Sequence, residues 1–235
     1  MQFFFGQYNL YDKSVQLDHL EQKHCLKVLR KKTGELIQVT DGTGKIYQTR
    51  IIDDNWKNPI FLCESIKDVP QRNYSLSIAI ALTKNLQRIE WFLEKSTEIG
   101  IDHIYFIETK HSEKVKYKKE RFDNILRSAA KQSENLKLPK LHDIQSFSDF
   151  LGNPFFDKEQ KFIAYCQEKP ETHLFHQLEK DLPVCVLIGP EGDFSKEEVQ
   201  LAESRGFKRI SLGNARLRTE TAGIVACEIV NLANL

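Results

Sequence analysis

From residue 76 onward, short apolar runs alternate with stretches of helical periodicity, and this alternation restricts the fold more than any other feature of the chain. Helical spacing of apolar residues occurs at Asn85–Ile99, Arg121–Lys137, Ser195–Arg205 and Thr219–Asn234. Runs typical of buried strands separate these helices, at Leu76–Leu82, His103–Glu108, Phe162–Cys166, Val184–Ile188 and Arg209–Leu212. Because strands that alternate with helices form crossover units, the pattern predicts an α/β fold with a doubly wound, mostly parallel sheet.

The first 70 residues have a different pattern. Two β-prone runs, Leu36–Thr40 and Lys45–Ile52, flank a glycine-rich turn, and Ile60–Ile66 supplies a further strand. Together with the aromatic opening Phe3-Phe4-Phe5, these runs predict a small β-barrel. The pattern changes at Val69-Pro70-Gln71-Arg72, so we expect two domains, 1–70 and 71–235.

Properties of the whole chain exclude several classes of protein. No run approaches 18 apolar residues, and the first residues lack the basic flank and cleavage site of a secretion signal, so we expect a cytosolic protein that does not bind membranes. The 34 basic and 33 acidic residues nearly cancel, so net charge is uninformative. The five cysteines are widely spaced, which predicts reduced thiols and no metal site.

Two glycine-bearing stretches follow predicted strands near the C-terminus. Leu187 to Ser195 reads Leu-Ile-Gly-Pro-Glu-Gly-Asp-Phe-Ser, and Leu212 to Ala222 reads Leu-Gly-Asn-Ala-Arg-Leu-Arg-Thr-Glu-Thr-Ala. Both loops should open at the same edge of the sheet, where α/β proteins bind ligands. Ser195 is expected to cap the following helix, as is Thr219 or Thr221 for the last one. The sequence disfavours a nicotinamide oxidoreductase, because Leu82-Thr83-Lys84-Asn85 lacks the dinucleotide fingerprint of glycines.

A basic segment lies in the predicted barrel. Between residues 23 and 32 the chain has no acid, and if Leu26, Val28 and Leu29 face inward, its cations project together as a phosphate backbone requires. An ordinary solvated face explains the same pattern equally well. The cationic and histidine residues of this basic segment are Lys23, His24, Lys27, Arg30, Lys31 and Lys32.

Five ordered motifs bring these features together. They are His24 to Arg30 (His-Cys-Leu-Lys-Val-Leu-Arg), Lys95 to Gly100 (Lys-Ser-Thr-Glu-Ile-Gly), Ala129 to Ser133 (Ala-Ala-Lys-Gln-Ser) and the two glycine-bearing stretches. Across the whole chain they resemble the RsmE family of 16S ribosomal RNA uridine-N3 methyltransferases, a branch of the knotted SPOUT methyltransferases.

The resemblance implies a SPOUT-type knotted parallel sheet with flanking helices, preceded by a small PUA-like β-barrel that binds RNA. The C-terminal segment would thread through a loop as a deep trefoil knot, which is rare among proteins. It further implies a homodimer with S-adenosylmethionine bound in the knot. The residues that would line the cofactor pocket are Leu187, Ile188, Gly189, Pro190, Glu191, Gly192, Leu212, Gly213, Leu217, Arg218 and Ala222.

The chain departs from the family pattern at three places. Asp193 stands where the family has a second glycine, and Asn214-Ala215-Arg216 replaces the more usual Pro-Arg-Ile. Glu134-Asn135 follows Gln132-Ser133 where many relatives have Gly-Arg, which leaves open which cation contacts RNA; Lys137 or Lys140 could substitute.

The methyl transfer that the resemblance implies determines which chemical roles the site residues must fill. Uridine N3 carries a proton and is a poor nucleophile, so the enzyme must remove that proton or stabilise the resulting anion. We expect Arg218 to orient the uracil or stabilise its enolate, and Glu220 to position Arg218 or act as the base. A plain first-turn acid at a helix start is the alternative for Glu220.

The substrate would be 16S rRNA or the assembled small ribosomal subunit, with the target base flipped out. Ribose 2′-O methylation and a non-catalytic RNA-binding assembly factor are the alternative functions. The candidates for contact with substrate RNA are His24, Lys27, Arg30, Lys84, Lys95 and Gln132.

Overall fold

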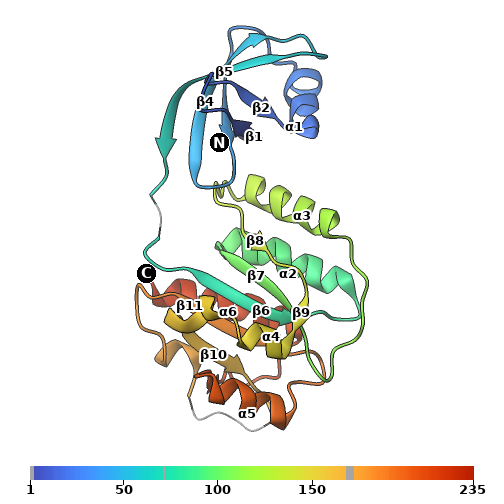
Figure 1. Ribbon diagram of the computed structural model, residues 1–235, viewed down its shortest axis with the longest axis vertical. Helices are drawn as coiled ribbons and strands as arrows, with labels where there is room; N and C mark the ends of the chain where they lie inside the picture. The colour runs from blue at the N-terminus through green and yellow to red at the C-terminus, as the bar shows by residue number, and fades with distance from the viewer. Residues whose placement is uncertain (1–2, 71, 168–171) are drawn as a thin grey trace. The chain divides into compact units, whose positions relative to one another are not determined.

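The computed structural model describes residues 3–70, 72–167 and 172–235 (Figure 1). The chain divides into two compact units. The first contains residues 3–70 together with Ala130–Leu138, and the second contains Arg72–Ala129 and Pro139–Leu235. The domain boundary expected at Val69 to Arg72 includes Gln71, which lies outside the described residues.

The first unit is a curled five-stranded sheet in the order β2-β1-β3-β4-β5. Its strands are β1 (Phe3–Tyr8), β2 (Val15–Leu17), β3 (Leu36–Thr40), β4 (Lys45–Asp53) and β5 (Ile60–Asp68). Of the pairings among these strands, that of β1 with β3 is parallel and the others are antiparallel. Two register shifts between β4 and β5 bend this long hairpin, as β-bulges do. Alternate residues such as Phe4, Val39 and Ile51 point inward to form the core, so the small β-barrel that the sequence predicted is a curled sheet with its own core.

A helical segment connects β2 to β3. It consists of α1 (His19–Lys23) and a π-helical turn, His24–Val28. Cys25 is buried against the barrel core, whereas Val28 is 63% exposed. The expectation that Val28 faces inward is therefore wrong, because the wider π-helical turn rotates the residues that follow Cys25 relative to α-helical spacing.

The segment Ala130–Leu138 completes the first unit from far along the sequence. Leu136 and Leu138 pack with Phe3, Phe5 and Ala130. The Leu138 amide donates to Gly42 O at 2.9 Å, and the Gly44 amide donates to Leu136 O at 3.2 Å. These contacts explain why the helix predicted to Lys137 is too long. The helix α3 (Lys119–Gln132) ends at Gln132, and Glu134 then adopts a left-handed φ of 56°.

The second unit is built on a parallel sheet in the order β12-β10-β11-β6-β7-β8, with β9 also paired to β7. All of its recorded pairings are parallel, so the predicted α/β fold class is confirmed. Its strands are β6 (Leu76–Ala81), β7 (His103–Glu108), β8 (Lys140–Leu141), β9 (Gln145–Ser146), β10 (Gln160–Ala164), β11 (Val184–Ile188) and β12 (Lys208–Ile210). The sequence pattern did not reveal β8 and β9, which are only two residues long.

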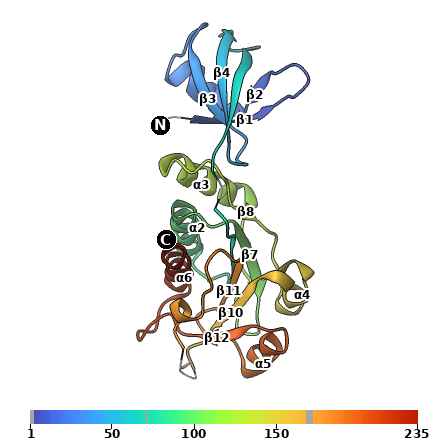
Figure 2. The same ribbon diagram turned by 90° about the vertical axis from the view of Figure 1, so that its left-hand side faces the viewer.

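Helices cover both faces of this sheet (Figure 2). One face packs against α2 (Leu86–Ile99), α3 and α6 (Thr219–Ala233). The other packs against α4 (Phe147–Leu151) and α5 (Lys196–Ser204). Short 3₁₀ turns occur at Pro154–Lys158 and Leu174–His176.

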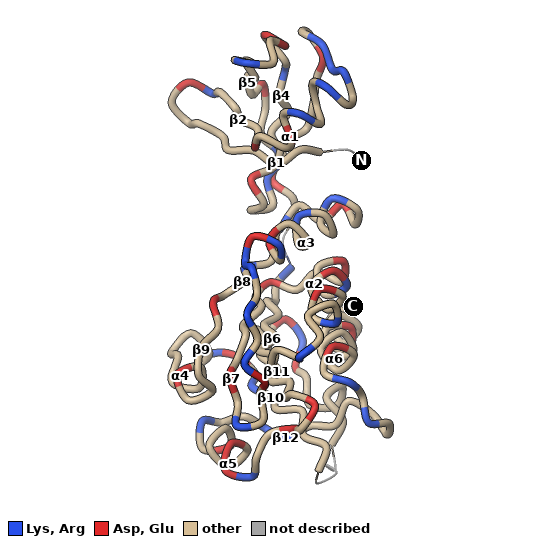
Figure 3. Tube along the Cα trace, turned by 90° about the vertical axis from the view of Figure 1, so that its right-hand side faces the viewer, with Lys and Arg blue, Asp and Glu red and all other residues tan. Residues whose placement is uncertain are grey.

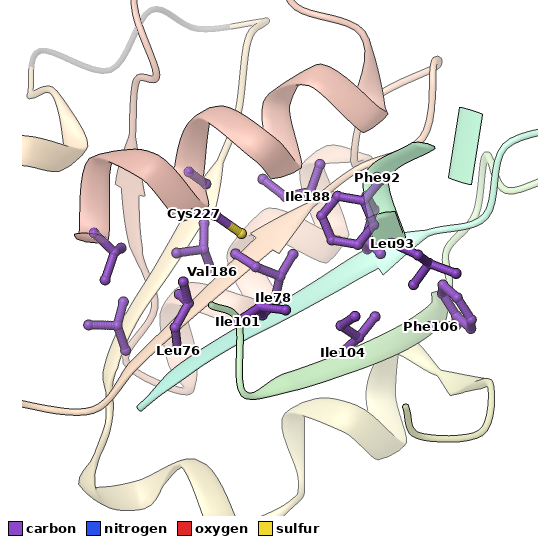
Figure 4. Packing of buried hydrophobic residues seen from close by; sticks show 14 of the residues in the cluster. Leu76, Ile78, Phe92, Leu93, Ile101, Ile104, Phe106, Val186, Ile188 and Cys227 are labelled. Carbon is purple, nitrogen blue, oxygen red and sulfur yellow. The ribbon is translucent and has the colours of Figure 1, made fainter. Parts of the chain in front are cut away.

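Alternation along the strands separates the two cores. Ile78, Val186 and Ile104 enter the core under α2 and α6 (Figure 4). Ala79 and Leu187 enter the core under α4 and α5. Such fully apolar strands are expected where both faces of a sheet are buried.

The helix starts agree with the sequence in part. Ser195 caps α5 in a reciprocal capping box with Glu198, as predicted. The expected cap of α6 by Thr219 or Thr221 is wrong, because Arg218 occupies the cap position and makes no side-chain capping bond.

The threading of the C-terminal segment into a knot stays a prediction. Among the described residues, no helix is both long and apolar enough to cross a bilayer.

Candidate functional site

Three adjacent parallel strands end at one edge of the second unit's sheet, and the loop after each lines the same pocket. The strands are β10, β11 and β12. Their loops contribute Tyr165–Gln167, Gly189–Glu191 with Asp193, and Ser211–Arg218. The pocket has a volume of about 590 Å³, within the range of roughly 300–1,000 Å³ that small-molecule sites occupy. The prediction that the two glycine-bearing loops open at one edge is confirmed.

Most of the predicted pocket residues line this cavity. They are Ile188, Gly189, Pro190, Glu191, Leu212, Gly213, Leu217, Arg218 and Ala222. Leu187 does not line it, because strand alternation turns its side chain into the core under α4 and α5. Gly192 is also absent from the lining, and a Cβ there would lie 3.0 Å from His111 Cβ.

One wall of the pocket was not expected from the sequence. The strand predicted as Phe162–Cys166 ends at Ala164, which leaves Tyr165, Cys166 and Gln167 in a loop that faces the cavity. The strand predicted as Arg209–Leu212 likewise ends at Ile210. The residues that line the pocket but were not expected there are Ala164, Tyr165, Cys166, Gln167, Asp193, Ile210, Ser211, Asn214, Ala215, Arg216 and Thr219.

Hydrogen bonds from side chains hold the loops in place. The Thr219 hydroxyl donates to Gly189 O at 3.0 Å, which joins the start of α6 to the loop after β11. Arg216 donates to Glu191 O at 3.3 Å. The Ser211 hydroxyl and Gly213 bond to each other in both directions, at 2.9 and 3.1 Å, and Gly213 has a φ of 134° that favours glycine.

Asp193 connects two walls of the pocket. It is buried, with a relative exposure of 7%, and has a left-handed φ of 63°. Its Oδ2 accepts from the Cys166 amide at 3.0 Å, and its Oδ1 accepts from the Phe194 amide at 2.9 Å. An aspartate thus adopts a backbone conformation that glycine usually adopts. It does so at the position where the sequence departs from the family pattern.

Arg218 and Glu220 occupy different environments. Arg218 is exposed and lines the pocket. Glu220 is buried, and Arg88 Nε of α2 lies 3.8 Å from its Oε1. Its Oε2 has no hydrogen-bond partner among the residues that the structure describes. Arg88 Nη1 also lies 3.7 Å from Glu191 Oε1, so this arginine stands between two carboxylates.

The two candidate RNA-contacting lysines of the second unit differ in position. Lys84 is exposed in the loop after β6, at the edge where the pocket opens. Lys95 lies on α2, about 14 Å further along the helix than Leu86 and therefore toward the opposite edge. It pairs with Glu94 at 2.7 Å and Glu98 at 2.9 Å.

The other candidates for RNA contact belong to the first unit or to the end of α3. His24 begins the π-helical turn, with its ring centroid 5.9 Å from that of Phe4. Lys27 Nζ lies 3.7 Å from the ring centroid of Trp56. Arg30 and Gln132 are exposed.

Acids neutralise part of the basic segment 23–32. Lys31 pairs with Glu35 at 2.7 Å, and Lys32 pairs with Asp54 at 3.1 Å. Figure 3 shows basic and acidic residues interspersed along the chain rather than sorted into separate regions. Lys27 and Arg30 are therefore the better candidates within this segment for contact with a phosphate backbone.

The described cysteines are free thiols, and Cys166 is the exposed member of the five. Burial raises the pKa of the Cys25 thiol to about 11, which keeps it protonated at neutral pH. Within the described ranges, no group of three or more histidine, cysteine or carboxylate side chains is placed to hold a metal ion.

The chain is similar to known proteins over most of its length. A family model described as an RNA methyltransferase domain matches residues 70–231, and one described as an RNA methyltransferase PUA domain matches residues 21–60. A Mesomycoplasma hyopneumoniae protein named ribosomal RNA small subunit methyltransferase E is 29% identical over 215 residues, which cover 88% of this chain and 89% of the relative.

Two solved structures share the fold over nearly their whole length. The crystal structure of a probable rRNA-methyltransferase from Porphyromonas gingivalis is 35% identical, with a TM-score of 0.89, and the match covers 100% of this chain and 98% of the other. A Legionella pneumophila protein described as a "putative methyltransferase", solved with bound S-adenosylmethionine, is 27% identical with a TM-score of 0.82 and coverage of 99% and 97%.

Proposed function

The chain belongs to the RNA methyltransferase family, and on that premise we propose that it is an S-adenosylmethionine-dependent methyltransferase of small-subunit ribosomal RNA. The single observation that supports this most is the pocket formed by the loops after β10, β11 and β12. The names of the relatives support ribosomal RNA as the substrate class.

The pocket's residues fit S-adenosylmethionine. Leu212, Leu217 and Ala222 offer apolar surface to an adenine ring. Main-chain groups of the loops around Gly189 and Gly213 can approach a flat ligand closely. Asp193 and Glu191 place negative charge in the lining, which suits a cation. When bound, the cofactor supplies an electrophilic methyl group.

We propose N3 of a uridine in 16S rRNA as the acceptor, which is the position that the resemblance to the RsmE family implies. Loss of the N3 proton leaves negative charge on the ring oxygens, and a cation nearby stabilises it. Arg218 is suited to this role because it is charged, exposed and part of the pocket lining. Holding the base in attack geometry supplies a large part of the remaining rate enhancement.

Glu220 has a different role from the two that we expected, which were to position Arg218 or to act as the base. As a base it would have to reach the bound uracil, yet it does not line the pocket and faces Arg88. We therefore assign Glu220 to the positioning of Arg88, which in turn lies near Glu191 of the pocket loop. The N3 proton would pass to solvent or to another group of the assembled complex.

The PUA-type unit supports the choice of RNA as substrate. Lys27 and Arg30 of this unit would contact RNA phosphates, and Lys84 of the second unit would do the same beside the pocket. We further propose that the protein acts as a homodimer, in the cytoplasm where ribosomal RNA is assembled into subunits.

Mass spectrometry of nuclease-digested small-subunit RNA tests this function. RNA from cells that lack the protein should contain one uridine that purified protein and S-adenosylmethionine convert to N3-methyluridine. A methyl group that appears on a ribose 2′ oxygen would replace the N3 assignment with the first alternative. Failure to methylate either naked RNA or small subunits, despite RNA binding, would favour the non-catalytic assembly factor.

A further inference from the structure

Among the described residues of the pocket loops, Asp193 both departs from the family pattern and is held by a specific set of contacts. It accepts the Cys166 amide from the loop after β10 and the Phe194 amide from its own loop. Its carbonyl oxygen lies 3.0 Å from His111 Nδ1, and its amide donates to Pro190 O at 2.9 Å. Both the backbone and the side chain of this residue are thus fixed by neighbouring groups.

A glycine would satisfy the backbone at this position without a side chain. The left-handed φ of 63° costs a non-glycine residue strain, although aspartate tolerates it better than most residues do. The carboxylate therefore has to contribute something that offsets this strain. One contribution is visible directly, because the bond from the Cys166 amide fastens the loop 165–167 to the loop 189–194, while the bond from the Phe194 amide holds the carboxylate within its own loop.

The second contribution is charge. Asp193 is 7% exposed, whereas Arg216, Arg218 and Glu191, the other charged residues of the described pocket lining, are all exposed. Water and salt screen an exposed charge much more than a buried one. The preference of the pocket for a charged ligand should therefore depend on Asp193 more than on the exposed charged residues around it.

We propose that Asp193 is a positioning and selectivity residue of the cofactor pocket: it holds the two loops together and makes the pocket prefer the cationic cofactor over the product. This inference rests on the proposed function. S-adenosylmethionine carries a sulfonium charge that S-adenosylhomocysteine has lost, so a buried carboxylate in the lining favours the first. The preference helps the product to leave after each turnover.

Two variants separate the two contributions. Asp193→Asn keeps a residue that tolerates the left-handed region and keeps one acceptor oxygen, but removes the charge. Asp193→Gly removes the charge and both hydrogen bonds while relaxing the backbone, so the variant should fold. Glu197→Gln is the matched control, because Glu197 is an exposed acid at the start of α5 that pairs with Lys110 and does not line the pocket.

Calorimetric titration with each ligand measures the effect. For Asp193→Asn we expect the Kd for S-adenosylmethionine to rise about tenfold and that for S-adenosylhomocysteine to rise less than about threefold, as loss of a partly screened charge predicts. For Asp193→Gly we expect both constants to rise, with the preference for the cation again reduced. Glu197→Gln should bind both ligands as the wild type does.

Hydrogen exchange gives a readout that needs no ligand. The Cys166 and Phe194 amides should exchange faster in Asp193→Gly than in the wild type, because they lose their acceptor. The inference is overturned if Asp193→Gly binds S-adenosylmethionine within about twofold of the wild type, or if Asp193→Asn weakens both ligands equally. Wild-type protein that binds neither ligand would refute the proposed function, and this inference with it.

Discussion

Arg218 and Glu220 are two positions apart at the start of α6, yet the fold gives them opposite surroundings. Arg218 is exposed at the pocket, and Glu220 is buried beside Arg88. Residues two apart on a helix point in different directions, so a shared motif does not imply a shared contact. At the scale of single residues, the side chain's direction decides its chemistry.

Removing the Arg218 guanidinium should lower the rate of methyl transfer. For Arg218→Ala we expect kcat to fall by about 10²-fold or more, the usual effect of losing a donor that stabilises transition-state charge. Steady-state kinetics with saturating cofactor measures it. Arg216→Ala is the control, because Arg216 bonds the main chain of Glu191 and should alter cofactor affinity more than kcat. Equal kcat values for Arg218→Ala and the wild type would remove Arg218 from the chemistry.

Glu159 should make the stability of the second unit depend on pH. Burial raises the pKa of this carboxyl to about 7 from 4.5, and the nearby Asp102 charge adds to the effect. Between pH 4.5 and about pH 7 the folded state binds more protons at Glu159 than the unfolded state does. The free energy of unfolding therefore falls as the pH rises through this range. The ionised form costs the folded state up to about 3 kcal/mol above pH 7.

The Glu159→Gln variant tests that pH dependence. It should be more stable than the wild type at pH 8 and close to it at pH 5. Urea unfolding followed by Trp91 fluorescence in a Trp56→Phe background reports the second unit alone, since the chain has two tryptophans. A stability difference that is the same at both pH values would contradict the raised pKa.

At the scale of elements, close approach of α2 and α6 depends on a glycine inside a helix. Gly223 lies in α6, and a Cβ at this position would lie 2.6 Å from Phe92 Cε2 and 3.3 Å from Ile80 Cδ1. Phe92 is fully buried, so its ring has little free space to move into. The helix accepts the unfavourable glycine because this side of α6 packs directly on the ring.

A methyl group added at Gly223 should destabilise the protein despite improving the helix. Gly223→Ala gains about 1 kcal/mol of helix propensity but loses about 1–3 kcal/mol to overpacking, so we expect a net loss of about 1 kcal/mol. Urea unfolding with the Trp91 probe measures it. Leu232→Ala is the control, because Leu232 lies in the same helix with 50% exposure and the exchange hardly changes propensity, so its effect should stay within about 0.5 kcal/mol. A Gly223→Ala protein that is more stable than the wild type would contradict the close packing.

At the scale of the whole molecule, the division into units does not follow chain order. Ala130–Leu138 belongs with residues 3–70 because Leu136 and Leu138 cover Phe3 and Phe5. A fragment that stops at residue 70 would leave those two aromatic side chains without this cover. The proposed activity uses both units, since Lys27 and Arg30 belong to the first unit and the pocket belongs to the second.

The first unit's cations should contribute to RNA affinity through charge. Reversing Lys27 and Arg30 to glutamate should weaken RNA binding and make log affinity depend less steeply on log salt, by about one in slope for each phosphate that is no longer neutralised. Filter binding across a salt series measures both quantities. Reversing Lys158 and Lys180 is the control, because these exposed lysines precede β10 and β11 at the edge opposite the pocket. Equal effects from both pairs would leave the first unit without a specific role.

Local signals in the sequence were enough to predict most of the longer strands and helices and the sheet edge where the site forms. Strand and helix periods, the Ser195 cap and the glycine-bearing loops are local signals, and parallel strands bring their carboxyl ends together without further information. Contacts between residues that are far apart in the chain depend instead on how the folded elements pack. The loop at Tyr165–Gln167, the contact of Glu220 with Arg88 and the return of Ala130–Leu138 to the first unit all depend on packing between distant segments, for which a single sequence carries no local pattern.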